Sequence, residues 1–109
     1  RAVDAIRFSN GYVAAVSDAE IFAAKRVIDG CGVGCEPASA ASVAGVRSLV
    51  AQGTIGPQQR VVAVLTGHLL KDPGTLLQYH RDTEPPPSGA NRPVEIDADL
   101  REVERQLGK

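Results

Sequence analysis

The sequence predicts an α/β fold, as part of an open, mostly parallel three-layer sheet that is incomplete on its own. Short apolar segments rich in valine alternate with segments whose apolar residues recur at helical spacing. A parallel sheet has to be covered by helices on both faces, and this chain has too few predicted helices to cover its own apolar strands. We therefore expect the chain to be a fragment that completes a larger sheet.

The predicted elements follow one another along the chain. They are a helix over 1–9, a strand over 12–16, a helix over 17–30, a short strand over 33–35, a helix over 38–52, a strand over 61–65, a helix over 73–81, an edge strand over 94–96 and a helix over 98–107. Ser17 and Glu20 have the spacing of a capping box. Lys25 is expected on the solvated face of that helix, and Asp97 is expected to cap the last one.

Three parts are predicted from these elements. Residues 1–82 form the main α/β part, 83–93 a proline-rich linker, and 94–109 a terminal strand and helix.

Composition excludes several functional classes. The chain has 109 residues, 43% hydrophobic and 23% charged, as in soluble globular proteins. The nine arginines and three lysines are scattered and the net charge is −1, so we expect no nucleic-acid partner. No apolar run is long enough to span a membrane, and residues 1–20 lack a signal-peptide pattern. Cys31 and Cys35 do not have metal or redox spacing, and they are expected to be reduced thiols in a cytoplasmic protein.

The strongest strand signal, Val61–Leu65, ends at Thr66 and Gly67. Ligands of open α/β sheets bind beyond the carboxyl ends of the strands, so the Thr66 hydroxyl is a candidate ligand contact. The alternative, which the residues leave equally open, is that Thr66 only satisfies the turn after its own strand. Glu36 follows another predicted strand and is expected either to face the same pocket or to be a surface acid.

Two further side chains near this strand end are expected to be structural. His68 lacks an orienting carboxylate in the sequence nearby, which argues against a general base. Lys71 lies just before Asp72 and Pro73, which resemble a helix cap and first position, so a catalytic role for Lys71 is disfavoured.

Two long motifs resemble the threonine synthase family. They are Gly34–Gly45 (GCEPASAASVAG) and Leu65–Pro73 (LTGHLLKDP), and the segments Val16–Ile21 and Pro93–Ile96 are also similar. The resemblance implies the fold of the tryptophan synthase β chain and its relatives, which use pyridoxal 5'-phosphate (fold type II). It implies the activity of a carbon–oxygen lyase acting on phosphates, which converts O-phosphohomoserine and water to threonine and phosphate.

The resemblance also implies roles for individual residues. Thr66 takes the position that contacts the pyridine nitrogen of the cofactor, and Glu36 falls in a turn near the cofactor. The lysine that forms the Schiff base would lie in an amino-terminal part outside this chain, so the chain alone is expected to be inactive and the complete enzyme to be a homodimer. Leu69 stands where the family usually has glycine. The alternatives are a related lyase, such as threonine dehydratase, and a non-catalytic α/β interaction module.

Overall fold

We describe the chain from a computed structural model, which covers residues 1–83, 85–87, 90 and 92–108. The chain divides into two compact units, Arg1–Pro73 and Gly74–Lys109.

Three helices form the regular part of the first unit, and all three agree with the predicted ranges to within a residue or two. They are α1 (Ala2–Phe8), α2 (Asp18–Gly30) and α3 (Pro37–Ala51). Helix α3 begins where it does because Pro37 occupies its first turn and restricts Glu36 to an extended conformation. None of the helices in the described part of the chain combines the length and apolar character needed to cross a membrane.

The predicted capping box at the start of α2 is confirmed. The Ser17 hydroxyl accepts a hydrogen bond from the Glu20 amide, and the Glu20 carboxylate accepts one from the Ser17 amide at 2.7 Å. These two bonds satisfy two of the amides that a helix leaves without partners at its amino end.

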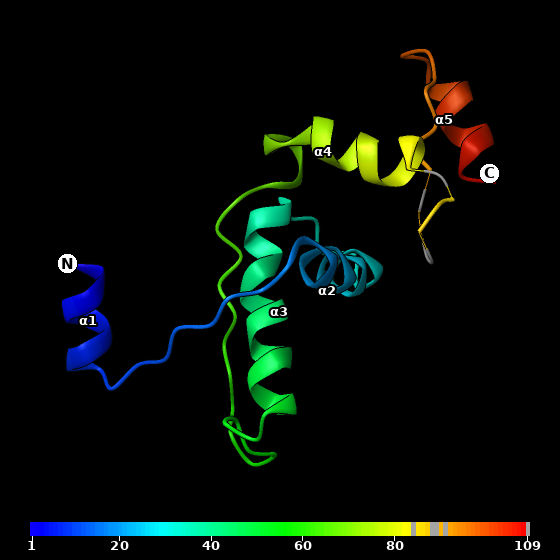
Figure 1. Ribbon diagram of the computed structural model, residues 1–109. Helices are drawn as coiled ribbons and strands as arrows, with labels where there is room; N and C mark the ends of the chain where they lie inside the picture. Colours follow the sequence, from blue (N-terminus) through cyan, green and yellow to red (C-terminus); the bar gives the residue numbers. More distant parts are fainter. Residues whose placement is uncertain (84, 88–89, 91, 109) are drawn as a thin grey trace. The chain divides into compact units, whose positions relative to one another are not determined.

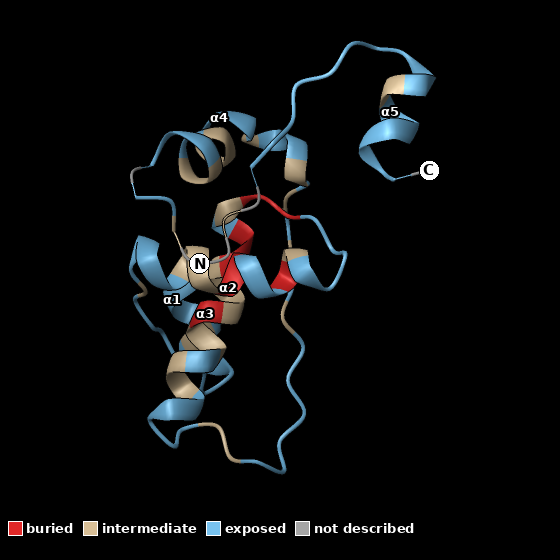
Figure 2. Ribbon diagram, turned by 90° about the vertical axis from the view of Figure 1, so that its right-hand side faces the viewer, coloured by how far each residue is buried: buried red, intermediate tan, exposed pale blue. Residues whose placement is uncertain are grey.

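Helices α2 and α3 pack against each other and enclose the core of this unit (Figures 1 and 2). Most of the core residues are small, which lets the two helices approach closely; the core is Ala24, Ile28, Cys35, Ala40 and Ala44. Val16 and Leu65 pack against the edge of this core from the two extended segments. Helix α1 contributes no buried residue, and its Phe8 is exposed.

The predicted strands over 12–16 and 61–65 are extended chain without strand pairing in the described residues. A strand is defined by its hydrogen-bonded neighbour, and the sequence shows only that a segment is suited to pairing. Their apolar side chains remain largely uncovered, and Val62 is 88% exposed. At 33–35 the pairing is a single antiparallel bridge between Cys35 and His68.

The prediction that Lys25 is solvated is wrong. Its side chain is buried in the core region, at 1% exposure, and its Nζ bonds both carboxylate oxygens of Asp29 at 2.9 and 2.8 Å. Asp29, one helical turn after Lys25, makes this burial possible, because a buried ammonium group needs a nearby opposite charge.

The regular elements described in the second unit are helical, and its other described residues are irregular. α4 (Pro73–Leu77) begins at the predicted proline at the boundary of the units, and a π-helical turn, η2 (Gln78–Asp82), continues it. The last helix, α5 (Leu100–Gln106), is capped by Asp99 and not by the predicted Asp97, because the helix begins two residues later than expected. The predicted edge strand over 94–96 is unpaired among the described residues, and residues 84, 88, 89 and 91 of the predicted 83–93 linker lie outside them.

Candidate functional site

The candidate site lies where the chain segment after Leu65 meets the amino end of α3. The extended segment returns alongside α3 towards this end of the helix (Figure 1). There the Glu36 amide donates a hydrogen bond of 3.0 Å to the Gly67 carbonyl. This contact, together with the Cys35–His68 bridge, brings the two residues selected from the sequence, Glu36 and Thr66, to one place.

Ser39 links the two segments through its side chain. Its hydroxyl accepts the Gly67 amide at 2.8 Å and lies 3.3 Å from Oγ1 of Thr66. Ser39 is 3% exposed, whereas Thr66 is exposed. The cluster therefore joins a buried serine to an exposed threonine.

Ser39 is a residue of this cluster that no pattern in the sequence singles out. Ser39 lies in the first turn of α3, within a run of small residues that favours close approach of a neighbouring segment. The structure shows that such an approach occurs, since the Gly67 backbone contacts this turn. What the sequence could not provide was the partner of the Ser39 hydroxyl, which is 28 residues away along the chain.

Gly67 is required at its position because of Glu36. A Cβ atom on Gly67 would overlap the Glu36 carboxyl carbon and Oε1. The absence of a side chain on Gly67 thus lets the buried Glu36 side chain lie against the backbone that carries Thr66.

Lys71 pairs with Glu36. Its Nζ lies 3.3 Å from Oε1 and 3.2 Å from Oε2, with the Glu36 side chain 11% exposed and the Lys71 side chain 66% exposed. This ion pair gives Lys71 a structural role, consistent with the expectation that it is not catalytic. Glu36 is accordingly not the surface acid of the alternative prediction.

His68 also has a structural role, as expected. Its Nδ1 accepts the Leu70 amide at 3.1 Å and so caps the short 3-10 helix η1 (Leu69–Lys71). An Nδ1 that accepts this bond leaves the proton of a neutral ring on Nε2.

Leu69, the residue at the departure from the family pattern, packs over Gly34. A Cβ atom on Gly34 would come within 3.1 Å of two Leu69 side-chain atoms. Gly34, on the facing segment, thus provides the space for the Leu69 side chain. Thr66 remains beside Ser39.

The thiols do not contribute to this site. Cys31 and Cys35 are both free, and burial raises the pKa of the Cys35 thiol. Among the described residues, no group of three or more His, Cys, Asp or Glu side chains is arranged to hold a metal ion.

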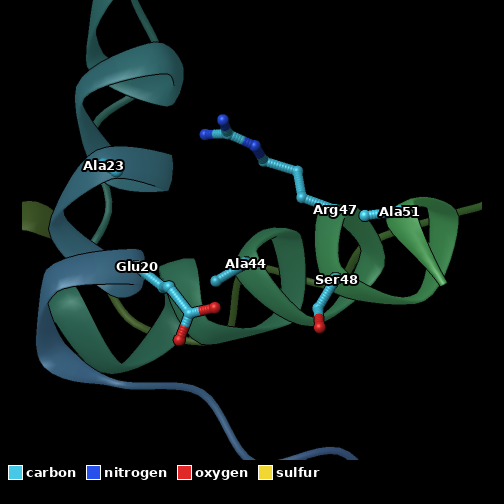
Figure 3. A pocket seen from close by; sticks show the side chains of 6 residues that line it. All are labelled: Glu20, Ala23, Ala44, Arg47, Ser48 and Ala51. Atoms are coloured by element: carbon cyan, nitrogen blue, oxygen red, sulfur yellow. The ribbon is translucent and has the colours of Figure 1, made fainter.

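A hollow of about 300 Å³ lies between α2 and α3, away from the Thr66 cluster (Figure 3). It is lined by Glu20, Ala23, Ala44, Arg47, Ser48 and Ala51. Glu20 is engaged in the capping box, and the Ser48 hydroxyl accepts a hydrogen bond from the side-chain Nε2 of Gln52 at 2.9 Å. Glu20 and Ser48 therefore already have hydrogen-bond partners close to them in the sequence. The hollow offers fewer polar groups to a ligand than the hydroxyl cluster does.

The chemistry available at the cluster is neutral hydrogen bonding. Hydroxyl groups both donate and accept, so Thr66 suits a heteroaromatic nitrogen or a carbonyl group of a ligand. Both oxygens of the one carboxylate in the cluster, on Glu36, lie near Lys71.

Comparisons with known proteins show which proteins the chain is similar to. The chain is 53% identical over 78 residues to the threonine synthase of Methanosarcina acetivorans, covering 71% of this chain and 19% of that protein. It is 36% identical over 108 residues to the threonine synthase of Methanocaldococcus jannaschii, covering 98% of this chain and 24% of that protein. It is 48% identical over 77 residues to the threonine synthase of Halalkalibacterium halodurans, covering 70% of this chain and 22% of that protein.

The chain therefore spans 19% to 24% of the length of these curated relatives. The model of one family, described as pyridoxal-phosphate dependent enzyme, matches residues 1–67. Since this match covers more than half of its 109 residues, the chain belongs to the family of pyridoxal-phosphate-dependent enzymes.

Proposed function

We propose that this chain is the carboxyl-terminal part of a threonine synthase, which converts O-phosphohomoserine and water to threonine and phosphate. The observation that carries the proposal is the identity of 53% to a threonine synthase over a region that includes most of the chain. The accessible Thr66 hydroxyl at the cluster supports it.

The residues present fit a pyridine nitrogen. Thr66 is exposed, so its hydroxyl is open to a ligand, and Ser39 fixes it from behind at 3.3 Å. The carboxylate of Glu36 forms an ion pair with Lys71, so the hydroxyl of Thr66 is the group left to meet the ring. The bound cofactor would supply withdrawal of electrons from the reacting carbon of the substrate.

Thr66 would set how strongly that withdrawal acts. A hydroxyl shares one hydrogen bond with the ring nitrogen, but it cannot hold the nitrogen protonated as an aspartate would. Milder withdrawal suits a reaction in which a leaving group is expelled and water is added. Glu36, held by Lys71 against Gly67, would keep the turn that bears Thr66 in place.

We also propose that residues 12–16 and 61–65 become strands of the three-layer parallel sheet when the rest of the polypeptide is present. The exposed valines of these segments support this, since Val13, Val62 and Val64 are all more than half exposed. Covering such side chains is the main driving force for folding. A self-contained interaction module, the alternative from a different class, would be expected to bury them within the chain itself.

The remaining assignments are part of the same proposal. The stretch Leu65–His68 favours threonine synthase over threonine dehydratase, the alternative within the enzymes. The partners would be O-phosphohomoserine, the amino-terminal part of the enzyme and a second subunit, with no nucleic acid or membrane. The two free thiols support a cytoplasmic location.

The test uses the full-length polypeptide that contains this chain, loaded with pyridoxal phosphate. We expect phosphate release from O-phosphohomoserine and threonine as product. Release of 2-oxobutanoate from threonine without phosphate release would favour the dehydratase. In parallel, the 109-residue chain alone should release no phosphate; turnover by the chain alone would contradict the proposed need for an amino-terminal part.

A further inference from the structure

We propose that Ser39 is a positioning residue that sets the direction of the Thr66 hydroxyl, so that the Thr66 proton points outward to the ring nitrogen of the cofactor. This inference rests on the proposed function, and it extends that function to a residue behind the contact itself. Ser39 would determine which of the two hydroxyls donates in the Ser39–Thr66 hydrogen bond, and it would not itself contact the substrate.

The Ser39 hydroxyl has few ways to satisfy its hydrogen-bonding groups. A serine hydroxyl has one proton and two acceptor positions. One acceptor position is taken by the Gly67 amide at 2.8 Å, because an amide can only donate. Ser39 is 3% exposed, so its own proton is shielded from water and needs an acceptor inside the protein.

Thr66 Oγ1, at 3.3 Å, is the acceptor that the described part of the chain offers to this proton. The reverse direction, from Thr66 to Ser39, would give Ser39 two donors and leave its own proton buried without an acceptor there. An unsatisfied buried polar group is costly. The Ser39 proton is therefore assigned to Thr66.

This assignment leaves the Thr66 proton without an acceptor among the residues that the structure describes. Thr66 is exposed, so its proton can be donated to a ligand on the open side. The ligand atom must then be an acceptor, which for a pyridine ring means the unprotonated nitrogen. The buried serine thus selects one protonation state of the ring through the hydroxyl in front of it.

The experiment measures the ¹⁵N chemical shift of the pyridine nitrogen in the full-length enzyme loaded with ¹⁵N-labelled pyridoxal phosphate. The variants are Ser39→Ala, Thr66→Ala and their combination. Ser42→Ala is the matched control, because the Ser42 hydroxyl is one turn away and donates to the Ser39 carbonyl at 2.9 Å. Ser39→Thr retains the hydroxyl and tests rescue.

We expect Ser39→Ala to move the ¹⁵N shift in the same direction as Thr66→Ala and to weaken cofactor binding about threefold to tenfold. In the Thr66→Ala background, Ser39→Ala should change the shift no further, because it acts through the Thr66 hydroxyl. Ser39→Thr and Ser42→Ala should keep the wild-type shift. If Ser39→Ala does not fold, Ser39→Cys, with its weak donor, should move the shift in the same direction.

Failures of the two proposals are distinguishable. A shift that responds to Thr66→Ala but not to Ser39→Ala, or equal effects of Ser39→Ala with and without Thr66, would overturn this inference alone. A wild-type enzyme that binds no cofactor, or a ring nitrogen that does not respond to Thr66→Ala, would overturn the proposed cofactor contact and this inference with it.

Discussion

The carboxylate of Glu36 is held by the ammonium group of Lys71, 35 residues further along the chain, at 3.2 and 3.3 Å. This pair closes the turn that carries Thr66 against the amino end of α3. The Glu36 side chain is buried and the Lys71 side chain is exposed. The ion pair therefore gives the buried carboxylate a counter-charge in place of the water that it lacks.

Replacing Lys71 by alanine should destabilise the full-length enzyme without removing covalent cofactor binding. We expect a loss of about 1 kcal/mol in the free energy of unfolding, since the lysine is exposed and screened by solvent. Lys71→Arg should retain most of it. Borohydride reduction should still attach the cofactor in both variants; loss of attachment in both would identify Lys71 as the residue that binds the cofactor covalently.

Gly67→Ala should be destabilising because its Cβ would occupy the space of the Glu36 carboxyl group. The expected cost is about 1–3 kcal/mol, measured by denaturant unfolding of the full-length enzyme. Gly45→Ala is the control, because nothing lies within 4 Å of a Cβ at that helical position. Adding Glu36→Ala to Gly67→Ala should recover part of the loss, and strict additivity of the two changes would argue against the clash.

Lys25→Ala should be among the more damaging single changes in α2. It leaves the Asp29 carboxylate without its bidentate partner and opens a space in a buried region. We expect a loss of about 3 kcal/mol in unfolding free energy. Replacing the pair together, as Lys25→Met with Asp29→Leu, should cost less than Lys25→Ala alone; an equal or larger cost would show that the charge pair itself is needed.

The capping box predicts a specific acid dependence of stability. Hydrogen bonds from the backbone and side chain of Ser17 lower the pKa of Glu20 below its ordinary value of 4.5. The stabilisation is therefore complete above pH 4.5 and lost as the pH falls through the lower pKa of the folded state. We expect the free energy of unfolding, measured from neutral to acid pH, to fall less steeply with decreasing pH in Glu20→Gln than in wild type. Asp18→Asn, in the same turn, serves as control, and an unchanged slope in Glu20→Gln would exclude this role.

Local signals in the sequence were sufficient for the helices. The capping residues Ser17 and Glu20, and Pro37 at the start of α3, depend only on neighbours in the chain, so their effects are visible in sequence. Strand pairing is not local. The segment 61–65 has the composition of a buried strand, but its hydrogen-bonded neighbour is not determined by that composition. The prediction for Lys25 is wrong because a charged side chain predicts exposure unless its ion-pair partner is recognised.

The candidate site was predictable only in part, for the same reason. Thr66 and Glu36 were selected from strand ends and from a family resemblance, and the structure brings them together. The connection through Ser39 depends on a hydrogen bond across 28 residues, which no local pattern encodes. The roles of Thr66 and Glu36 towards the cofactor stay predictions.

The most direct measurement is phosphate release from O-phosphohomoserine by the full-length enzyme carrying Thr66, Thr66→Ser, Thr66→Ala or Thr66→Asp. Thr66→Ser keeps a hydroxyl and should retain most of the rate, whereas Thr66→Ala should lose about tenfold or more in kcat/KM. Thr66→Asp should still bind pyridoxal phosphate but divert turnover from phosphate elimination towards side reactions such as transamination. Wild-type rates in Thr66→Ala and Thr66→Asp would contradict the assignment of Thr66 to the ring nitrogen.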